Sequence, residues 1–173
     1  DIFEIRDLCH SKGIYLVEDA AQAHGSSYKG TKAGNFGIAA GFSFFSTKVM
    51  TTGEGGMVTT DSFELSAKMK SMREFGKMQK GIITNYHEYF GYNWRMPEVS
   101  ALLGIRQLLS IEDFIEKRTK IAEIYNSMLK GIRGIRIVNP PEKSRFNYFK
   151  YVLILENINR EIVFLVSDII FKL

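Results

Sequence analysis

The first 25 residues constrain the fold most tightly, because a helical pattern, a glycine and an apolar run follow one another without a gap. Apolar residues at helical spacing predict a helix over residues 1–12, and Gly13 is typical of the position just beyond a helix. Residues 14–17, Ile-Tyr-Leu-Val, predict a strand buried on both faces. This order is half of a β-α-β unit, so we expect an α/β protein with a mostly parallel sheet and flanking helices.

The rest of the chain continues the pattern and then changes character. We expect strands at residues 39–45, 57–60, 135–138 and 148–155, and helices at 61–75, at 97–131 with a break near 110–113, and from Asn159 onward. Residues 76–95 are expected to form a long loop, and loops of that length are usually functional or disordered. The change of pattern around the long helix predicts two parts, residues 1–110 and residues 111–173, the second being a small α+β unit.

Composition excludes several classes of protein. The 173 residues are 45% hydrophobic and 24% charged, as in ordinary globular proteins, and no apolar run is long enough for a membrane helix. The net charge of +4 comes without a block of like charges, which gives little support to nucleic-acid binding. A lone cysteine, Cys9, and three scattered histidines predict no metal site, and we expect a cytoplasmic protein. Because the chain starts without Met and stops without a capping signal, we expect a fragment of a longer protein.

Polar residues follow the first predicted strand directly. Ligands of open α/β sheets bind beyond the carboxyl ends of the strands, so Asp19, Gln22 and His24 could all meet one ligand there. The alternative is that Glu18 and Asp19 only cap or solvate a loop.

A lysine follows the second predicted strand. Side chains alternate along a strand, so Phe42 and Phe44 should face one way and Ser43 the other. Lys48 lies just beyond, and an amine that is partly desolvated beside aromatic and small residues favours its uncharged, nucleophilic form. That is the condition for a Schiff base, although an ordinary surface lysine is the commoner case. The glycine-rich residues 53–56 fit neither a dinucleotide fingerprint nor a Walker A loop, and a plain turn explains them.

Together these stretches resemble the DegT/DnrJ/EryC1/StrS family of sugar aminotransferases, which depend on pyridoxal 5′-phosphate and have the fold type I architecture. The resemblance lies in the order and spacing of five motifs, at residues 18–25, 34–37, 42–48, 53–57 and 91–96. It implies that residues 1–110 are the C-terminal part of the large cofactor-binding domain. Residues 111–173 would be the connecting helix and part of the small C-terminal domain.

The resemblance also implies a role for each matching residue. Lys48 would form the internal aldimine with the cofactor and move the proton during catalysis, and Asp19 would pair with the pyridine nitrogen. Gln22 would lie against the ring or its hydroxyl, and Ser43 would bind the phosphate. Asn93 would reach the phosphate of the neighbouring subunit in a homodimer.

The implied reaction moves an amino group from an amino acid, glutamate, to a nucleotide-linked keto-sugar, as in the synthesis of surface polysaccharides. His24 would either shape the site or only brace its loop. Family members are roughly twice as long, and the segment that carries a phosphate-binding turn and a stacking aromatic is missing. The alternative is therefore a catalytically silent fragment or relative that keeps the fold and the dimer surface. A nucleotide-binding Rossmann module is disfavoured, because no glycine fingerprint follows Val17.

Overall fold

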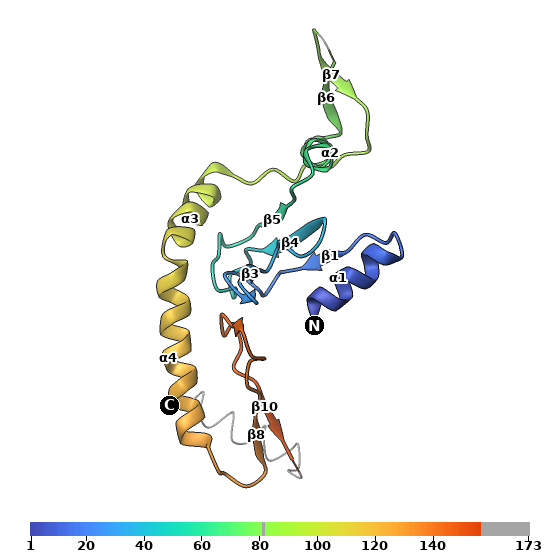
Figure 1. Cartoon of the computed structure of the whole chain (residues 1–173). Helices are drawn as coiled ribbons and strands as arrows, with labels where there is room; N and C mark the ends of the chain where they lie inside the picture. Colours follow the sequence, from blue (N-terminus) through green and yellow to red (C-terminus); the bar gives the residue numbers. More distant parts are fainter. Residues whose placement is uncertain (81, 157–173) are drawn as a thin grey trace.

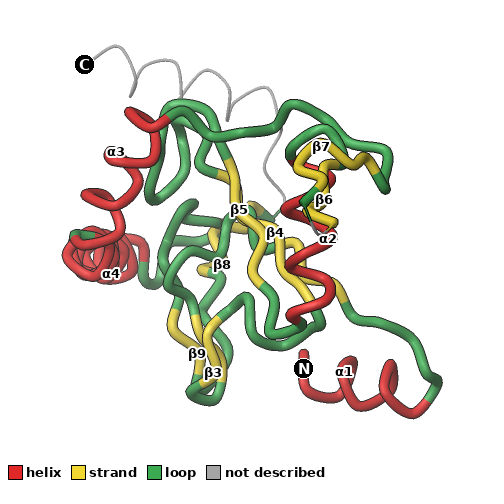
Figure 2. The backbone as a smooth tube through the Cα atoms, turned by 90° about the horizontal axis from the view of Figure 1, so that it is seen from above, coloured by secondary structure: helices red, strands yellow, loops and turns green. Residues whose placement is uncertain are grey.

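A computed structural model describes residues 1–80 and 82–156 of the chain. Its helices are α1 (Ile2–Ser11), α2 (Phe63–Arg73), α3 (Glu98–Leu109) and α4 (Ile111–Leu129). Its strands are β1 (Val17–Asp19), β2 (Ser27–Tyr28), β3 (Thr31–Lys32), β4 (Ala39–Ser43), β5 (Gly56–Thr59), β6 (Lys77–Lys80), β7 (Ile83–His87), β8 (Ile135–Ile137), β9 (Ser144–Arg145) and β10 (Leu153–Leu155). Figures 1 and 2 show α3 and α4 on one side of the central strands and α1 on the other.

The central sheet has the order β1-β4-β5. Strand β1 runs parallel to β4, and β5 returns antiparallel beside β4, so this part of the sheet is mixed. The expectation of a strand at residues 14–17 buried on both faces was wrong: the strand begins at Val17, whose side chain is 64% exposed. Among the described strands β1 also lies at the edge of its sheet, with β4 beside it.

Local signals explain the first two helices. Helix α1 starts with Asp1, whose carboxylate accepts a hydrogen bond from the Phe3 backbone N–H at 2.9 Å, and Gly13 follows its end with φ 64°. Helix α2 is capped by Ser62, whose hydroxyl accepts from the Leu65 N–H at 3.2 Å. The helix over residues 61–75 is thus confirmed with slightly shorter bounds.

The long loop expected at residues 76–95 contains a hairpin that the sequence did not indicate. Strands β6 and β7 pair antiparallel with a register irregularity between Met78 and Lys80. The chain then returns along the end of α2, where Tyr92 N–H donates to the Met72 carbonyl at 2.7 Å. In Figure 1 the hairpin projects from the end of the molecule that holds α2.

The predicted break in the long helix is confirmed at Ser110, which ends α3 and precedes α4. After α4, strand β8 pairs antiparallel with β10, while β9 joins β2 and β3 in a second small sheet. Only residues 153–155 of the strand expected at 148–155 are extended in a sheet. The helix expected from Asn159 lies outside the described residues.

A small core joins the two predicted parts of the chain. Phe44, Val49 and Met50 are buried against Ile111 and Ile115 at the start of α4. The division into residues 1–110 and 111–173 stays a prediction.

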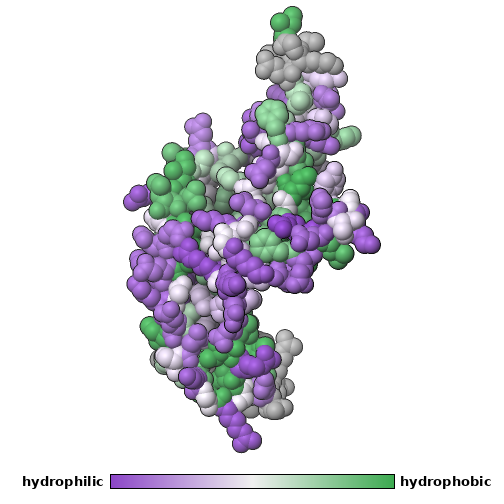
Figure 3. All heavy atoms as spheres, viewed as in Figure 1, coloured by the Kyte–Doolittle hydropathy of each residue, from purple (hydrophilic) through white to green (hydrophobic). Residues whose placement is uncertain are grey.

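Much apolar surface of α3 is exposed, and Figure 3 shows apolar atoms gathered over that helix. The exposed apolar side chains of α3 are Val99, Leu102, Leu103, Ile105, Leu108 and Leu109. Among the described residues, no helix is both long and apolar enough to cross a bilayer.

Candidate functional site

The candidate site lies where β1 and β4 end. The two strands are parallel and Asp19 is in register with Gly41, so their carboxyl ends form one edge of the sheet. The Ala20 N–H continues the pairing by donating to the Gly41 carbonyl at 2.9 Å. Asp19 and Ser43 therefore lie at the same edge, the position at which open α/β sheets bind ligands.

Lys48 is held at this edge by the residues that follow it. Val49 and Met50 are both buried in the core, and Lys48 N–H donates to the Phe45 carbonyl at 3.0 Å. The Lys48 side chain is half-buried, and its Nζ lies 5.0 Å from the centroid of the Phe149 ring. The predicted aromatic neighbours were those of the preceding strand, and the aromatic ring that the structure places beside the amine is that of Phe149, which the sequence did not indicate.

His24 is the most deeply buried polar residue near this amine. Its side chain is 3% exposed, and its ring lies 5.5 Å from that of Phe42 and 5.8 Å from that of Phe44. The two phenylalanines thus share a face, as the alternation along the strand predicts. Burial lowers the pKa of His24; the Ser43 backbone opposes this shift, and the charge of Lys48 adds to it. The imidazole is therefore neutral at pH 7. The Ser43 backbone lies near enough to the ring to affect its pKa, but within the described residues neither ring nitrogen has a hydrogen-bond partner of good geometry.

Glu18, next to the candidate Asp19, has a structural role. Its Oε1 accepts hydrogen bonds from the N–H groups of Phe36 at 2.6 Å and Gly37 at 2.9 Å, and its Oε2 accepts from that of Gly34 at 2.8 Å. For Glu18, the structure therefore supports the alternative in which the carboxylate only caps a loop. Asp19 is exposed, and one carboxylate oxygen accepts from the Ala21 N–H at 3.1 Å.

Gln22 and Ser43 lie close to the same edge. The Gln22 side chain is exposed, and the Gln22 backbone carbonyl accepts a hydrogen bond of 2.8 Å from the side-chain amide of Asn147. The Ser43 hydroxyl accepts a long hydrogen bond of 3.3 Å from the Phe45 N–H. Asp19 and Ser43 thus end two paired strands, Gln22 and His24 follow the first strand, and Lys48 follows the second and interacts with His24.

Asn93 is not part of that group. It is exposed, forms an isolated bridge with Glu74, and accepts a hydrogen bond from Arg95 Nε at 3.1 Å. Both of these contacts are local and lie away from the residues around Lys48.

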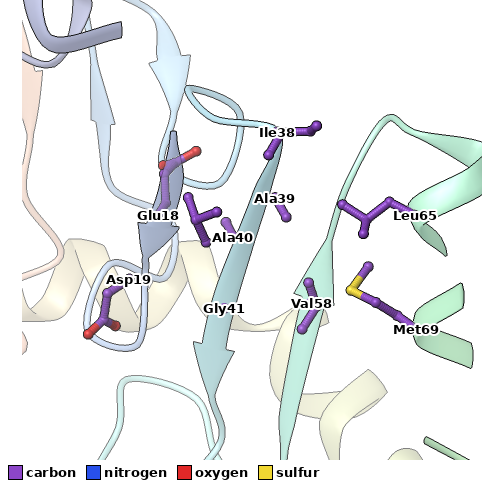
Figure 4. A pocket seen from close by; sticks show the side chains of 10 residues that line it. Glu18, Asp19, Ile38, Ala39, Ala40, Gly41, Val58, Leu65 and Met69 are labelled. Carbon is purple, nitrogen blue, oxygen red and sulfur yellow. The ribbon is translucent and has the colours of Figure 1, made fainter. Parts of the chain in front are cut away.

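A hollow of about 550 Å³ adjoins the candidate site, and Asp19 is the one candidate residue among those that line it. It is bounded by β1, β4 and β5 on one side and by Leu65 and Met69 of α2 on the other. Figure 4 shows the Asp19 carboxylate pointing away from Met69 and Leu65. Residues 1–80 and 82–156 contain no cluster of three or more His, Cys, Asp or Glu that could hold a metal ion.

The amine, carboxylate and hydroxyl at this edge of the sheet fit a phosphorylated carbonyl compound that also has a ring nitrogen. A half-buried amine can attach to a carbonyl, a carboxylate at the same edge can pair with a protonated nitrogen, and a hydroxyl can bind phosphate. The unpartnered nitrogens of His24 leave a buried donor and acceptor for a further contact. The fold and site thus define an α/β protein with a lysine-centred site at the carboxyl edge of its sheet.

Comparison with known proteins identifies the family. The profile of the DegT/DnrJ/EryC1/StrS aminotransferase family matches residues 1–167, and the chain belongs to this family. It is 38% identical over 135 residues to GDP-perosamine synthase of Vibrio cholerae, covering 76% of this chain and 35% of that protein. The corresponding enzyme of Escherichia coli O157:H7 is 37% identical over 156 residues, covering 90% of this chain and 41% of that protein.

Solved structures agree with the family. PseC of Helicobacter pylori, an aminotransferase of pseudaminic acid biosynthesis, matches with a TM-score of 0.86 and 29% identity, over 91% of this chain and 42% of that one. DesV of S. venezuelae, solved in complex with a ketimine intermediate, matches with a TM-score of 0.86 and 32% identity, over 97% of this chain and 44% of that one. The chain thus spans less than half the length of these relatives. The predicted family and fold class are confirmed.

Two neighbours of the site were missed at the sequence level, Asn147 and Phe149. They contact residues about a hundred positions earlier in the chain, and no local pattern marks such a contact. The one available signal was the placement of Asn147 between aromatic residues in an otherwise polar loop.

Proposed function

We propose that this chain is part of an enzyme that transfers an amino group from an amino acid, glutamate, to a nucleotide-linked keto-sugar with pyridoxal 5′-phosphate as cofactor. The observation that carries the proposal is the Lys48 amine, half-buried beside Phe149 at the sheet edge that also holds Asp19. Family membership supports the reaction class. The names of relatives support a sugar as the acceptor, since GDP-perosamine synthases and an aminotransferase of pseudaminic acid biosynthesis are among them.

Each candidate residue has a proposed task. When bound, pyridoxal phosphate would supply an electron sink for the electron pair left behind as a proton departs from a carbon. Lys48 Nζ would attach the cofactor and then, once released, carry the proton between carbon atoms. Asp19 would hold a proton on the pyridine nitrogen, Ser43 would donate to the phosphate, and Gln22 would contact the ring or its hydroxyl.

His24 would contribute to the same site as a neutral group. Its nitrogens, buried and unpartnered in the described structure, could accept or donate one hydrogen bond to a bound molecule or an ordered water. The two aromatic neighbours of its ring exclude water from that side. We therefore retain the role of shaping the site over that of only bracing the loop.

We also propose a homodimer, with Asn93 serving the site of the neighbouring subunit. Two observations support this: Asn93 is exposed and bonded only locally among the described contacts, and the nearby helix α3 exposes a large apolar face. Sedimentation of the wild-type protein should give a dimer. A monomer at micromolar concentration would contradict this part of the proposal.

The amino-transfer half-reaction tests the proposed function. Incubation of the protein with pyridoxal phosphate and glutamate should yield pyridoxamine phosphate and 2-oxoglutarate, detected by mass spectrometry, and Lys48→Ala should abolish the conversion. Lys120→Ala is a matched control on the exposed face of α4, and its activity should equal that of the wild type. Cofactor binding without conversion by any amino acid would instead favour the catalytically silent relative.

A further inference from the structure

The segment from Phe146 to Lys150 is fastened to the loop that carries Gln22 and His24. The side-chain amide of Asn147 donates to the backbone carbonyls of both residues, at 2.8 Å and 3.0 Å. Its side-chain oxygen accepts from the Phe149 N–H at 2.9 Å. Asn147 is only 5% exposed, so these bonds are shielded from water and hold two distant segments together.

Two further contacts fix the segment from the other side. Arg118 of α4 donates from Nη1 to the Tyr148 carbonyl at 3.1 Å. Phe149 packs against the core cluster that also contains Val49 and Met50, the residues directly after Lys48. The Phe149 ring is therefore fixed in place, and Lys48 Nζ lies 5.0 Å from its centroid.

We propose that Phe149 is a positioning residue for Lys48, with Asn147 setting the distance between its ring and the loop of Gln22 and His24. This inference rests on the proposed function of Lys48 and deepens it. The ring body keeps water from one side of the amine and limits where Nζ can lie. The ring face also attracts the ammonium form, which adds to the positioning but disfavours the uncharged form that reacts. Both effects restrict where Nζ can be when the cofactor arrives.

Lys150 provides an internal comparison for this contact. Its Nζ also lies 5.0 Å from the centroid of the Phe149 ring. Lys150 is exposed, however, while Lys48 is half-buried and followed directly by buried residues. Loss of the ring should therefore affect the reactivity of Lys48 more than that of Lys150.

The first test observes the contact without any cofactor. In the wild-type chain labelled with ¹³C at lysine Cε, the Lys48 signal, assigned with Lys48→Arg, should be shifted upfield by the ring current of Phe149. Phe149→Leu should return the signal to the position of exposed lysines, whereas Phe149→Tyr should retain the shift. Phe146→Leu is the matched control, because Phe146 lies in the same segment and pairs with Tyr148 instead. An unchanged Lys48 signal in Phe149→Leu would overturn the proposal.

The second test measures reactivity. After reaction with pyridoxal phosphate and borohydride, at a pH high enough for the amine to be uncharged in both proteins, the fraction of Lys48 labelled should fall about two- to fivefold in Phe149→Leu, because Nζ is then held less closely at the cofactor position. Asn147→Ala should also lower the fraction of Lys48 labelled, although the Phe149 ring is still present. In Phe149→Tyr, which keeps an aromatic ring, the fraction labelled should equal that of the wild type. Equal labelling in the Leu and Tyr variants would also overturn the proposal.

The two claims can fail separately. The NMR measurement uses no cofactor, so an unlabelled wild-type Lys48 would count against the proposed function alone. An absent ring-current shift would count against the role of Phe149 alone.

Discussion

Glu18 offers the clearest energetic prediction, because its single carboxylate accepts three backbone hydrogen bonds from residues 34–37. A hydrogen bond to a charged acceptor contributes about 1.5–3 kcal/mol net, but Glu18 is only half-buried, and water lowers this toward about 1 kcal/mol for each bond. Glu18→Ala removes all three acceptors and should lower the free energy of unfolding by about 3 kcal/mol. In Glu18→Gln, the one remaining oxygen can still accept from Phe36 and Gly37, but an amide NH₂ then faces the Gly34 N–H. The Gln variant should therefore lose about half as much.

Urea unfolding monitored by circular dichroism would measure both variants. The slope of the free energy against urea concentration should stay unchanged, so that the shift in midpoint reports stability alone. The reasoning would be refuted if Glu18→Gln were as unstable as Glu18→Ala, because the number of accepted bonds would then be irrelevant. A loss below about 1 kcal/mol in Glu18→Ala would refute it as well, since it would mean that water replaces the carboxylate at little cost.

Three further predictions concern pH and packing. Burial lowers the pKa of His24 from 6.5, so the unfolded chain takes up a proton at this residue before the folded chain does as the pH falls. The melting temperature of the wild type should therefore fall below about pH 6.5, and that of His24→Phe should fall less. Gly25→Ala places a methyl group at φ 70° and against the Ile115 side chain, and should lower the free energy of unfolding by about 1–3 kcal/mol in urea titrations. The hydrogen bond and charge of Arg145 lower the pKa of the exposed Glu112, so the stabilisation exists above pH 4.5 and is lost as the pH falls below it. Arg145→Met should therefore cost under about 1 kcal/mol near pH 7, and thermal melts of variant and wild type should converge in acid.

The sequence predicted those parts of the site that depend on local order. The polar residues after one strand and the lysine after the next predicted a common edge, since parallel strands end on the same side. Alternation along residues 39–45 placed Phe42 and Phe44 on one face, where both contact the His24 ring. The break in the long helix at Ser110 was also visible in the pattern.

The parts that were missed depend on contacts between distant segments. The apolar run at residues 14–17 indicates a preference for burial, but it does not say which element covers it, and Val17 is 64% exposed in the described structure. The β6–β7 hairpin has little alternation of polar and apolar residues and pairs with a register irregularity. Asn147 and Phe149 reach the site only because the chain turns back after the end of α4.

Specific trapping of pyridoxal phosphate on Lys48 would test the central claim most directly. The protein should be reacted with less than one equivalent of pyridoxal phosphate, reduced with borohydride and mapped by peptide mass spectrometry, alongside Lys48→Ala and Lys150→Ala. Lys150 is a matched control because its amine lies at the same 5.0 Å from the Phe149 ring. The proposed site predicts a phosphopyridoxyl group on Lys48 in the wild type and in Lys150→Ala, in about tenfold excess over other lysines, a preference of about 1.4 kcal/mol. Labelling spread evenly over the lysines of the folded protein, or unchanged in Lys48→Ala, would contradict it.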